Sequence, residues 1–196
     1  MIAACLVNVE YEIFETSLGP CGIAWTYGSG PAPSPAVVGF QLPEATTELT
    51  EARIAQRSGG RKSNDAPTWT TQIIRRVCRH LEGNLQDFRD VEIDLEMAGS
   101  FARKVYQAAR EIPPGQTRTY GELARLLNKP NAARAVGQAL GNNPIALIVP
   151  CHRVVAAGGK PGGFTAHGGW ATKQRMLAIE GCYIESGDAP TLLATR

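Results

Sequence analysis

Long apolar runs, early basic residues and paired cysteines are all scarce in this sequence of 196 residues. No run of about 18 or more apolar residues occurs, so no membrane-spanning helix is expected. The first 15 residues contain Glu10, Glu12 and Glu15 but neither Lys nor Arg, so the basic start of a secretory signal is missing. We therefore expect an intracellular, cytoplasmic protein with no membrane partner.

Cysteines are few, odd in number and scattered, at Cys5, Cys21, Cys78, Cys151 and Cys182. This spacing argues against a disulfide framework and fits a reducing compartment. Cys78 and His80 form a short Cys-x-His pair that could bind zinc with Cys5 or Cys21. No second close pair of ligands supports such a site, and isolated cysteines are usually small buried hydrophobic residues. We predict no metal and no cofactor.

Acidic residues become rare in the second half of the chain. Residues 1–100 contain 8 basic and 13 acidic side chains, a net charge of −5, whereas residues 101–181 contain 11 basic and 3 acidic ones, a net charge of +8. An electropositive segment beside an acidic one indicates a half that binds a polyanion and a half that does not. A solvated basic surface gives the same pattern, so charge alone does not decide.

Hydrophobic periodicity and turn residues predict a mixed α/β chain. The helix predicted at 69–82 carries Ile73, Ile74, Val77 and Leu81 at the spacing of one buried face. Strands are predicted at 6–27 (two, joined by a turn at 18–22), 37–43 and 91–95, a further helix at 44–54, and loops at 28–35 and 58–68.

The sequence changes character at residue 100. Ser100 is a candidate N-cap for a helix to Arg110, with Phe101, Val105 and Ala108 on one face. Thr119 and Glu122 have the spacing of a capping box at the start of a helix ending near 127, and a turn at 129–131 leads to a second helix at 132–140. Two short helices joined by a brief turn match a helix-turn-helix, although two plain packed helices would look the same. We expect one domain at 1–99, a second at 100–186 and a tail at 187–196.

Chemistry is concentrated in Pro150-Cys151-His152-Arg153, which follows a hydrophobic run and is therefore expected against the core. A cysteine beside a base is how proteins make a thiolate, the form that attacks carbon. Glu180 downstream could orient the histidine as the third member of a Cys–His–acid arrangement. A purely structural Cys-His pair is the alternative, and a hydrolase and a transferase are not separated by these residues.

Five motifs together resemble the O6-alkylguanine-DNA alkyltransferase family, in the family's order and near its spacing. They are Pro113-x-Gly115-x-Thr117-x-Thr119-Tyr120-Gly121, Ala133-Arg134-Ala135-Val136-Gly137, Asn143-Pro144, Pro150-Cys151-His152-Arg153-Val154 and Glu180-Gly181. The resemblance is strong over 100–182 and weak over 1–99. It implies an α/β fold with an RNase H-like amino-terminal domain and a winged helix-turn-helix-like carboxy-terminal alkyltransferase domain.

The same resemblance implies the reaction and the residues that carry it out. Cys151 would take the alkyl (methyl) group from O6-alkylguanine in DNA in a stoichiometric, irreversible suicide reaction without a cofactor. His152, through a water molecule and with Glu180 behind it, would draw off the thiol proton. Tyr120 would hydrogen-bond N3 of the flipped guanine and help it take up a proton, and Asn143 would brace the turn leading into the active-site strand. Activity on O4-alkylthymine is left open.

The other matched residues would contact double-stranded DNA in its minor groove, with the protein acting as a monomer. Arg134 would fill the gap left by the flipped guanine. Small neighbours suit a groove only about 6 Å wide. The carbonyls of Cys151 and Val154 would accept from the exocyclic amine of guanine, and the Thr165 N–H would approach O6. The full substrate-binding set implied is Tyr120, Ala133, Arg134, Ala135, Gly137, Arg153, Val154 and Thr165.

Two rival functions use the same residues differently. A non-enzymatic reader of alkylated DNA would lack the reactive residue, and Cys151 argues against it. A cysteine hydrolase would need an oxyanion site and a water molecule that deacylates the enzyme.

Overall fold

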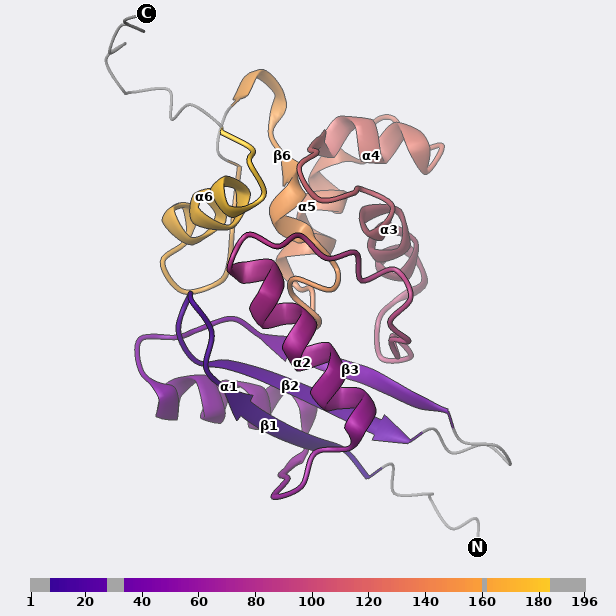
Figure 1. The fold of residues 1–196 in the computed structure, drawn as a ribbon. Coiled ribbons are helices and arrows are strands. Elements are labelled where there is room, and N and C mark those ends of the chain that lie inside the picture. Colours follow the sequence, from indigo (N-terminus) through magenta and orange to yellow (C-terminus); the bar gives the residue numbers. More distant parts are fainter. Residues whose placement is uncertain (1–7, 28–33, 160–161, 184–196) are drawn as a thin grey trace, which may run out of the picture.

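A computed structural model describes residues 8–27, 34–159 and 162–183 of the chain. Cys5, most of the loop predicted at 28–35 and the tail predicted at 187–196 lie outside these residues. The described chain forms a sheet with helices on both faces, followed by a mainly helical part (Figure 1). The α/β class is thereby confirmed. None of the described helices has the length and apolar character needed to cross a membrane.

The larger sheet has the strand order β3-β2-β1-β4. Its strands are β1 (Glu10–Phe14), β2 (Cys21–Tyr27), β3 (Pro35–Gln41) and β4 (Arg61–Lys62). Strand β2 pairs antiparallel with β1 and with β3, and β4 pairs in parallel with β1. This order and these directions fit the RNase H-like arrangement that the resemblance implies.

Alternation along β2 divides the residues of the sheet between two helices, because successive side chains of a strand face opposite sides. Ala24 packs with Ile54 of α1 (Thr47–Ser58) on one face. Ile23 and Trp25 belong to the main core, which includes Ile73, Val77 and Leu81 of α2 (Thr68–Leu81) on the other face (Figure 1). The predicted buried face of α2 is therefore confirmed, and α2 lies between the sheet and the rest of the chain.

The remaining elements form the part that holds Cys151. They are α3 (Ser100–Arg110), β5 (Arg118–Thr119), α4 (Tyr120–Leu126), α5 (Ala133–Gly141), a 3₁₀ turn η1 (Cys151–Arg153), β6 (Val154–Val155), a second 3₁₀ turn η2 (Ala157–Gly159) and α6 (Trp170–Ile179). The predicted capping box is confirmed: Thr119 Oγ1 accepts from Glu122 N–H, and the Glu122 carboxylate accepts from Thr119 N–H. Helices α4 and α5 pack together as the predicted pair, with β5 and β6 paired in parallel.

Four expectations from the sequence were wrong in detail. The segment 58–68 is not only a loop, because Arg61 and Lys62 add β4 to the sheet. Residues 91–95 form no strand, since only Ile93 makes a bridge, to Val37. The N-cap of α3 is Gly99, and Ser100 is the first helical residue. Cys151 lies in the 3₁₀ turn η1 rather than in a strand, because Arg153 N–H bonds back to Pro150 O and closes a tight turn.

Candidate active site

The chain enters the site through a turn that Asn143 holds in shape. Asn143 Nδ2 donates to Val149 O at 2.8 Å, and Asn143 Oδ1 accepts from Ile145 N–H at 3.0 Å. Within this turn the buried Leu147 has φ 68°, a left-handed conformation that costs a non-glycine residue about 1–3 kcal/mol. Two amide hydrogen bonds and a buried leucine thus fix the backbone just before Cys151.

Cys151 is the first residue of η1 and is almost completely buried, with 9% of its surface exposed. Burial raises the pKa of its thiol because a thiolate loses solvation there, while the neighbouring Asn143 side chain and the Lys173 cation act in the opposite direction. The resting group is therefore a thiol. It needs a base to become a nucleophile.

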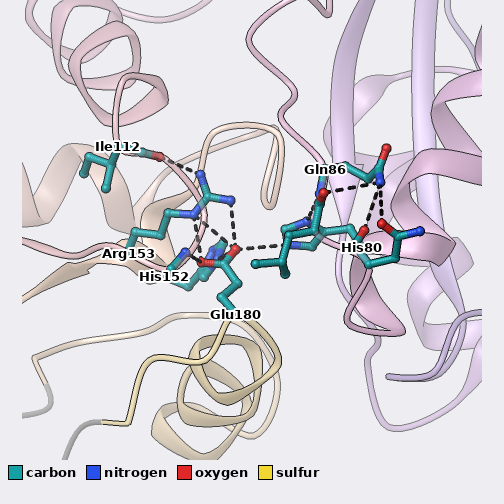
Figure 2. Close-up of polar contacts among 9 residues, drawn as sticks. His80, Gln86, Ile112, His152, Arg153 and Glu180 are labelled. Atoms are coloured by element: carbon teal, nitrogen blue, oxygen red, sulfur yellow. Dashed lines mark hydrogen bonds and ion pairs between the residues drawn. The ribbon is translucent and has the colours of Figure 1, made fainter.

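Glu180 follows α6 and lies at the centre of a buried polar cluster (Figure 2). Its Oε1 lies 3.0 Å from His152 Nε2, 3.0 Å from His80 Nε2 and 2.8 Å from Arg153 Nη2. Arg153 Nε lies 3.0 Å from Oε2, and Arg153 Nη1 donates to Ile112 O at 2.6 Å. The four side chains are at most 6% exposed, so the carboxylate is bound by His152, His80 and Arg153, and by Gly115 N–H at 3.3 Å, in place of water.

These contacts define what His152 is able to do. Glu180 is held ionised: burial alone would raise its pKa, but hydrogen bonds from His152, His80 and Arg153 outweigh burial and bring it far below its usual range. An ionised carboxylate can only accept, so His152 Nε2 carries the proton that joins them. Its Nδ1 has no protein partner among the described residues. Burial lowers the pKa of His152, so Nδ1 of the neutral ring is a lone pair available as a base.

Tyr120 and Lys173 border the other side of Cys151's turn. Lys173 is fully buried, donates to Val154 O at 2.6 Å and lies 5.7 Å from the centre of the Tyr120 ring. Tyr120 OH donates to Gly163 O at 3.3 Å. Gly162 has φ +67°, and a Cβ there would come within 3.0 Å of the Tyr120 ring, so glycine is required by both conformation and space.

The two carbonyls expected to accept from guanine are already used within the protein. Val154 O accepts from Lys173, and Cys151 O accepts from Val154 N–H. A carbonyl has two lone pairs, so each retains one for a ligand.

A cavity of about 390 Å³ opens beside Cys151. Thr165 lines it, with its hydroxyl donating to Gly141 O at 2.9 Å. Its other walls come from both parts of the chain: Phe40, Gln41, Leu42, Glu44, Arg53, Arg57, Leu140, Gly141, Asn142, Asn143, Ala146, Phe164 and Ala166. Arg57 also donates to Asn143 O at 2.8 Å, which ties α1 to the turn before the cysteine.

Of the residues expected to contact DNA, Ala133, Arg134, Ala135 and Gly137 lie on α5, whereas Arg153 is buried and bound to Glu180 and Ile112 O. Arg134 is exposed in the first turn of α5, between the half-buried Ala133 and Ala135. Gly137 faces Tyr120, since a Cβ there would lie 3.8 Å from its ring. The structure therefore brings Cys151, His152, Arg153 and Glu180 into one buried group, with Asn143, Tyr120 and Thr165 around it and Arg134 apart on the surface.

His80, Lys173 and Arg57 are site neighbours that the sequence analysis missed. His80 was considered only as a zinc ligand with Cys78. Both of its ring nitrogens are in fact used by Glu180 and by Gln86 N–H, and Cys78 Sγ donates instead to Glu15 O. No group of three or more His, Cys, Asp or Glu in the described ranges is arranged to hold a metal ion. No local sequence signal connects His80 to a carboxylate 100 residues away.

A family model and several related proteins match this chain, some over its second half and others over most of its length. A model of the 6-O-methylguanine DNA methyltransferase DNA-binding domain matches residues 100–182. A methylated-DNA–protein-cysteine methyltransferase of Mycolicibacterium paratuberculosis is 47% identical over 107 residues, which span 55% of this chain and 62% of that protein. One from Methanosarcina acetivorans is 35% identical over 171 residues, which span 87% of this chain and 97% of that protein.

Solved structures agree over most of the chain. The OGT of Mycobacterium tuberculosis in complex with DNA superposes with a TM-score of 0.69 at 33% identity, covering 88% of this chain and 93% of that one. The O6-methylguanine-DNA methyltransferase of Pyrococcus kodakaraensis gives 0.61 at 29% identity, covering 88% and 99%.

A buried cysteine next to a histidine and a carboxylate, on this two-part fold, defines the class of proteins that take alkyl groups from DNA onto their own cysteine. The chain belongs to the methylated-DNA–protein-cysteine methyltransferase family.

Proposed function

We propose that this protein repairs DNA by direct reversal, transferring the alkyl group of O6-alkylguanine to the sulfur of Cys151. The observation that carries the proposal is the relay formed by Glu180 and His152, the residue directly after Cys151, in which His152 Nε2 is bound to the carboxylate and Nδ1 has no protein partner among the described residues. His152 takes the thiol proton, directly or through a water molecule. The thiolate then attacks the alkyl carbon, so that an S–C bond forms as the C–O6 bond breaks.

Tyr120 assists the leaving group in this proposal. Its hydroxyl hydrogen-bonds N3 of the flipped guanine, and the guanine takes up a proton as it departs. The Cys151 and Val154 carbonyl oxygens use their remaining lone pairs to accept hydrogen bonds from the exocyclic amine of guanine. The Thr165 N–H approaches O6. No cofactor takes part, because the sulfur supplies the electron pair and guanine is the leaving group.

DNA binding is assigned to the exposed side of α5. We propose that α5 enters the minor groove, where small residues permit close approach, and that Arg134 occupies the gap left by the flipped base. The basic segment 101–181 supplies phosphate contacts, and one copy of the chain acts alone. We further propose an intracellular location, with 1–99 supporting the catalytic part at 100–186.

Each molecule is expected to act once. The product is a thioether, which has no carbonyl for water to attack, whereas the thioester of a cysteine hydrolase can be cleaved. With a methylated duplex in tenfold excess, repair must stop at one equivalent, and intact mass must rise by one methyl group located on the Cys151 peptide. Turnover well beyond one equivalent would refute the proposal.

Cys151→Ala provides the matched control for this experiment. The variant must lose transfer but still bind the duplex, because binding is assigned to α5. Methyl transfer to Cys182 or Cys78 in the variant would show that Cys151 is not the acceptor.

A further inference from the structure

His80 is the one histidine of α2, and it reaches the relay from the opposite part of the chain. Its side chain is 1% exposed, and the edge of its ring packs against Phe88 with the centroids 5.5 Å apart. Figure 2 shows His80 and His152 approaching Glu180 from different sides. Nothing in the relay described above requires a second histidine there.

The proton on His80 is fixed by its two partners. Gln86 N–H lies 3.0 Å from His80 Nδ1 and can only donate, so Nδ1 must be the acceptor. The proton of the neutral ring is therefore on Nε2, which points at Glu180 Oε1 at 3.0 Å. His80 is thus a hydrogen-bond donor to Glu180, locked in one tautomer by a backbone group.

His80 and His152 donate to the same oxygen atom, Glu180 Oε1, at the same distance of 3.0 Å. Donation from His80 holds that oxygen in place and takes up part of its negative charge. Both effects reach His152, because the position of Oε1 sets the orientation of the ring and its charge sets how firmly the ring holds a second proton.

We propose that His80 is a positioning residue for alkyl transfer, which holds Glu180 from the amino-terminal part of the chain and thereby sets the orientation and basicity of His152. The inference rests on the proposed function. It gives the sheet-bearing part of the protein a direct share in the chemistry of Cys151, in addition to the cavity wall and the Arg57 contact.

The charged and titratable groups around this cluster come from four segments. They are His152 and Arg153 of η1, Glu180 and Cys182 after α6, Arg76 of α2, which stacks on Phe88, and Asp87 with Asp90 of the following segment, which contact Arg76. Arg153 and Arg76 are the permanent cations among them, and both are unchanged in the variants below, so a difference between those variants reports the His80 contact.

The test is the pH dependence of single-turnover methyl transfer in three variants of His80. His80→Phe keeps an aromatic ring and removes both nitrogens. His80→Gln places an amide N–H where Nε2 lies, so it keeps the donor to Glu180. His80→Asn keeps an acceptor for Gln86 N–H but is too short to reach Glu180.

Loss of the donor leaves more negative charge on Oε1 and raises the pKa of His152. Below that pKa the base already holds a proton, so the acid limb of the rate profile must move to higher pH. In His80→Phe and His80→Asn we expect the midpoint of the acid limb to move up by about half a pH unit or more. The rate at neutral pH should fall by at most about fivefold. His80→Gln must restore the wild-type limb and a rate within about twofold.

Val77→Ala is the matched control, because Val77 is fully buried on α2 near His80 but has no polar group that could donate to Glu180. It must lower thermal stability without moving the acid limb. A limb that stays at its wild-type position in His80→Phe, or moves equally in Val77→Ala, overturns the inference. If His80→Phe does not fold, the other two variants decide the question: the acid limb must move in His80→Asn and stay at its wild-type position in His80→Gln. Absence of transfer by the wild-type protein would instead refute the proposed function.

Discussion

Glu180→Gln removes one charge from the buried cluster and leaves its size almost unchanged. Arg153, 5% exposed, then loses its only carboxylate partner in the described part of the chain. The amide oxygen of Gln can still accept, but its NH₂ group must face donors: Arg153 Nε and Gly115 N–H if it takes the place of Oε2, or the two histidines and Arg153 Nη2 if it takes the place of Oε1. Breaking a buried ion pair from one side costs about 3–5 kcal/mol, out of a total stability of about 5–15 kcal/mol for a typical protein.

The loss must also depend on pH in a known direction. Hydrogen bonds hold the pKa of Glu180 far below its usual range in the folded protein, whereas the unfolded chain titrates near a pKa of about 4.3. The carboxylate therefore contributes its full stability above about pH 5 and loses it as the pH falls below the unfolded value. The free energies of unfolding of wild type and Glu180→Gln must converge in acid.

Urea unfolding followed by tryptophan fluorescence measures both quantities, since Trp25 is fully buried. Glu10→Gln is the matched control, because the Glu10–Arg61 pair is exposed and its loss should cost at most about 1 kcal/mol. Equal costs for the two variants, or a Glu180→Gln cost that stays constant down to pH 3, would show that Glu180 does not anchor the cluster as described.

Three further predictions concern DNA and one buried lysine. Arg134→Ala should slow repair in duplex DNA much more than repair of the free O6-alkylguanine base, and equal losses in a rate assay would remove its proposed place in the stack. Affinity for duplex DNA should fall as salt rises, and the slope of log K against log salt concentration should correspond to roughly 3–6 phosphate contacts at about 0.9 each. An affinity that does not change between low and physiological salt would exclude binding dominated by the DNA backbone. Burial lowers the pKa of Lys173 to about 8 from 10.5, so the unfolded chain binds the extra proton between these values and wild-type stability should rise there by about 3 kcal/mol relative to Lys173→Met. A difference in unfolding free energy between the two proteins that is the same at pH 7.5 and at pH 10 would contradict this.

Local patterns predicted the elements that depend on nearby residues. The capping box at Thr119 and the buried face of α2 are properties of residues three or four apart, and both were confirmed. The strand predicted at 91–95 failed because its pairing partner, Val37, lies far away and offers only one bridge. Likewise β4 consists of two exposed charged residues, which carry no strand signal of their own.

The site shows the same division. The sequence placed Cys151, His152 and Arg153 together because they are consecutive, and it offered Glu180 as the acid that could orient His152, which the structure places within hydrogen-bond distance. His80 was considered only as a zinc ligand and Lys173 was not considered, because a buried polar residue looks like a surface residue until its partner is known. Both are buried only because a carboxylate and a carbonyl lie opposite them.

The cluster around Glu180 also has an order of assembly. A ribosome produces His80 first, His152 and Arg153 next, and Glu180 only 28 residues after His152. Until Glu180 emerges, the Arg153 cation has no carboxylate and the ring of His152 is not oriented, so the turn that carries Cys151 is not stabilised in its buried position. The thiol therefore acquires its base only after α6 has been synthesised and docked. A nascent chain that stops before residue 180 would carry Cys151 and His152 without the carboxylate that orients the histidine.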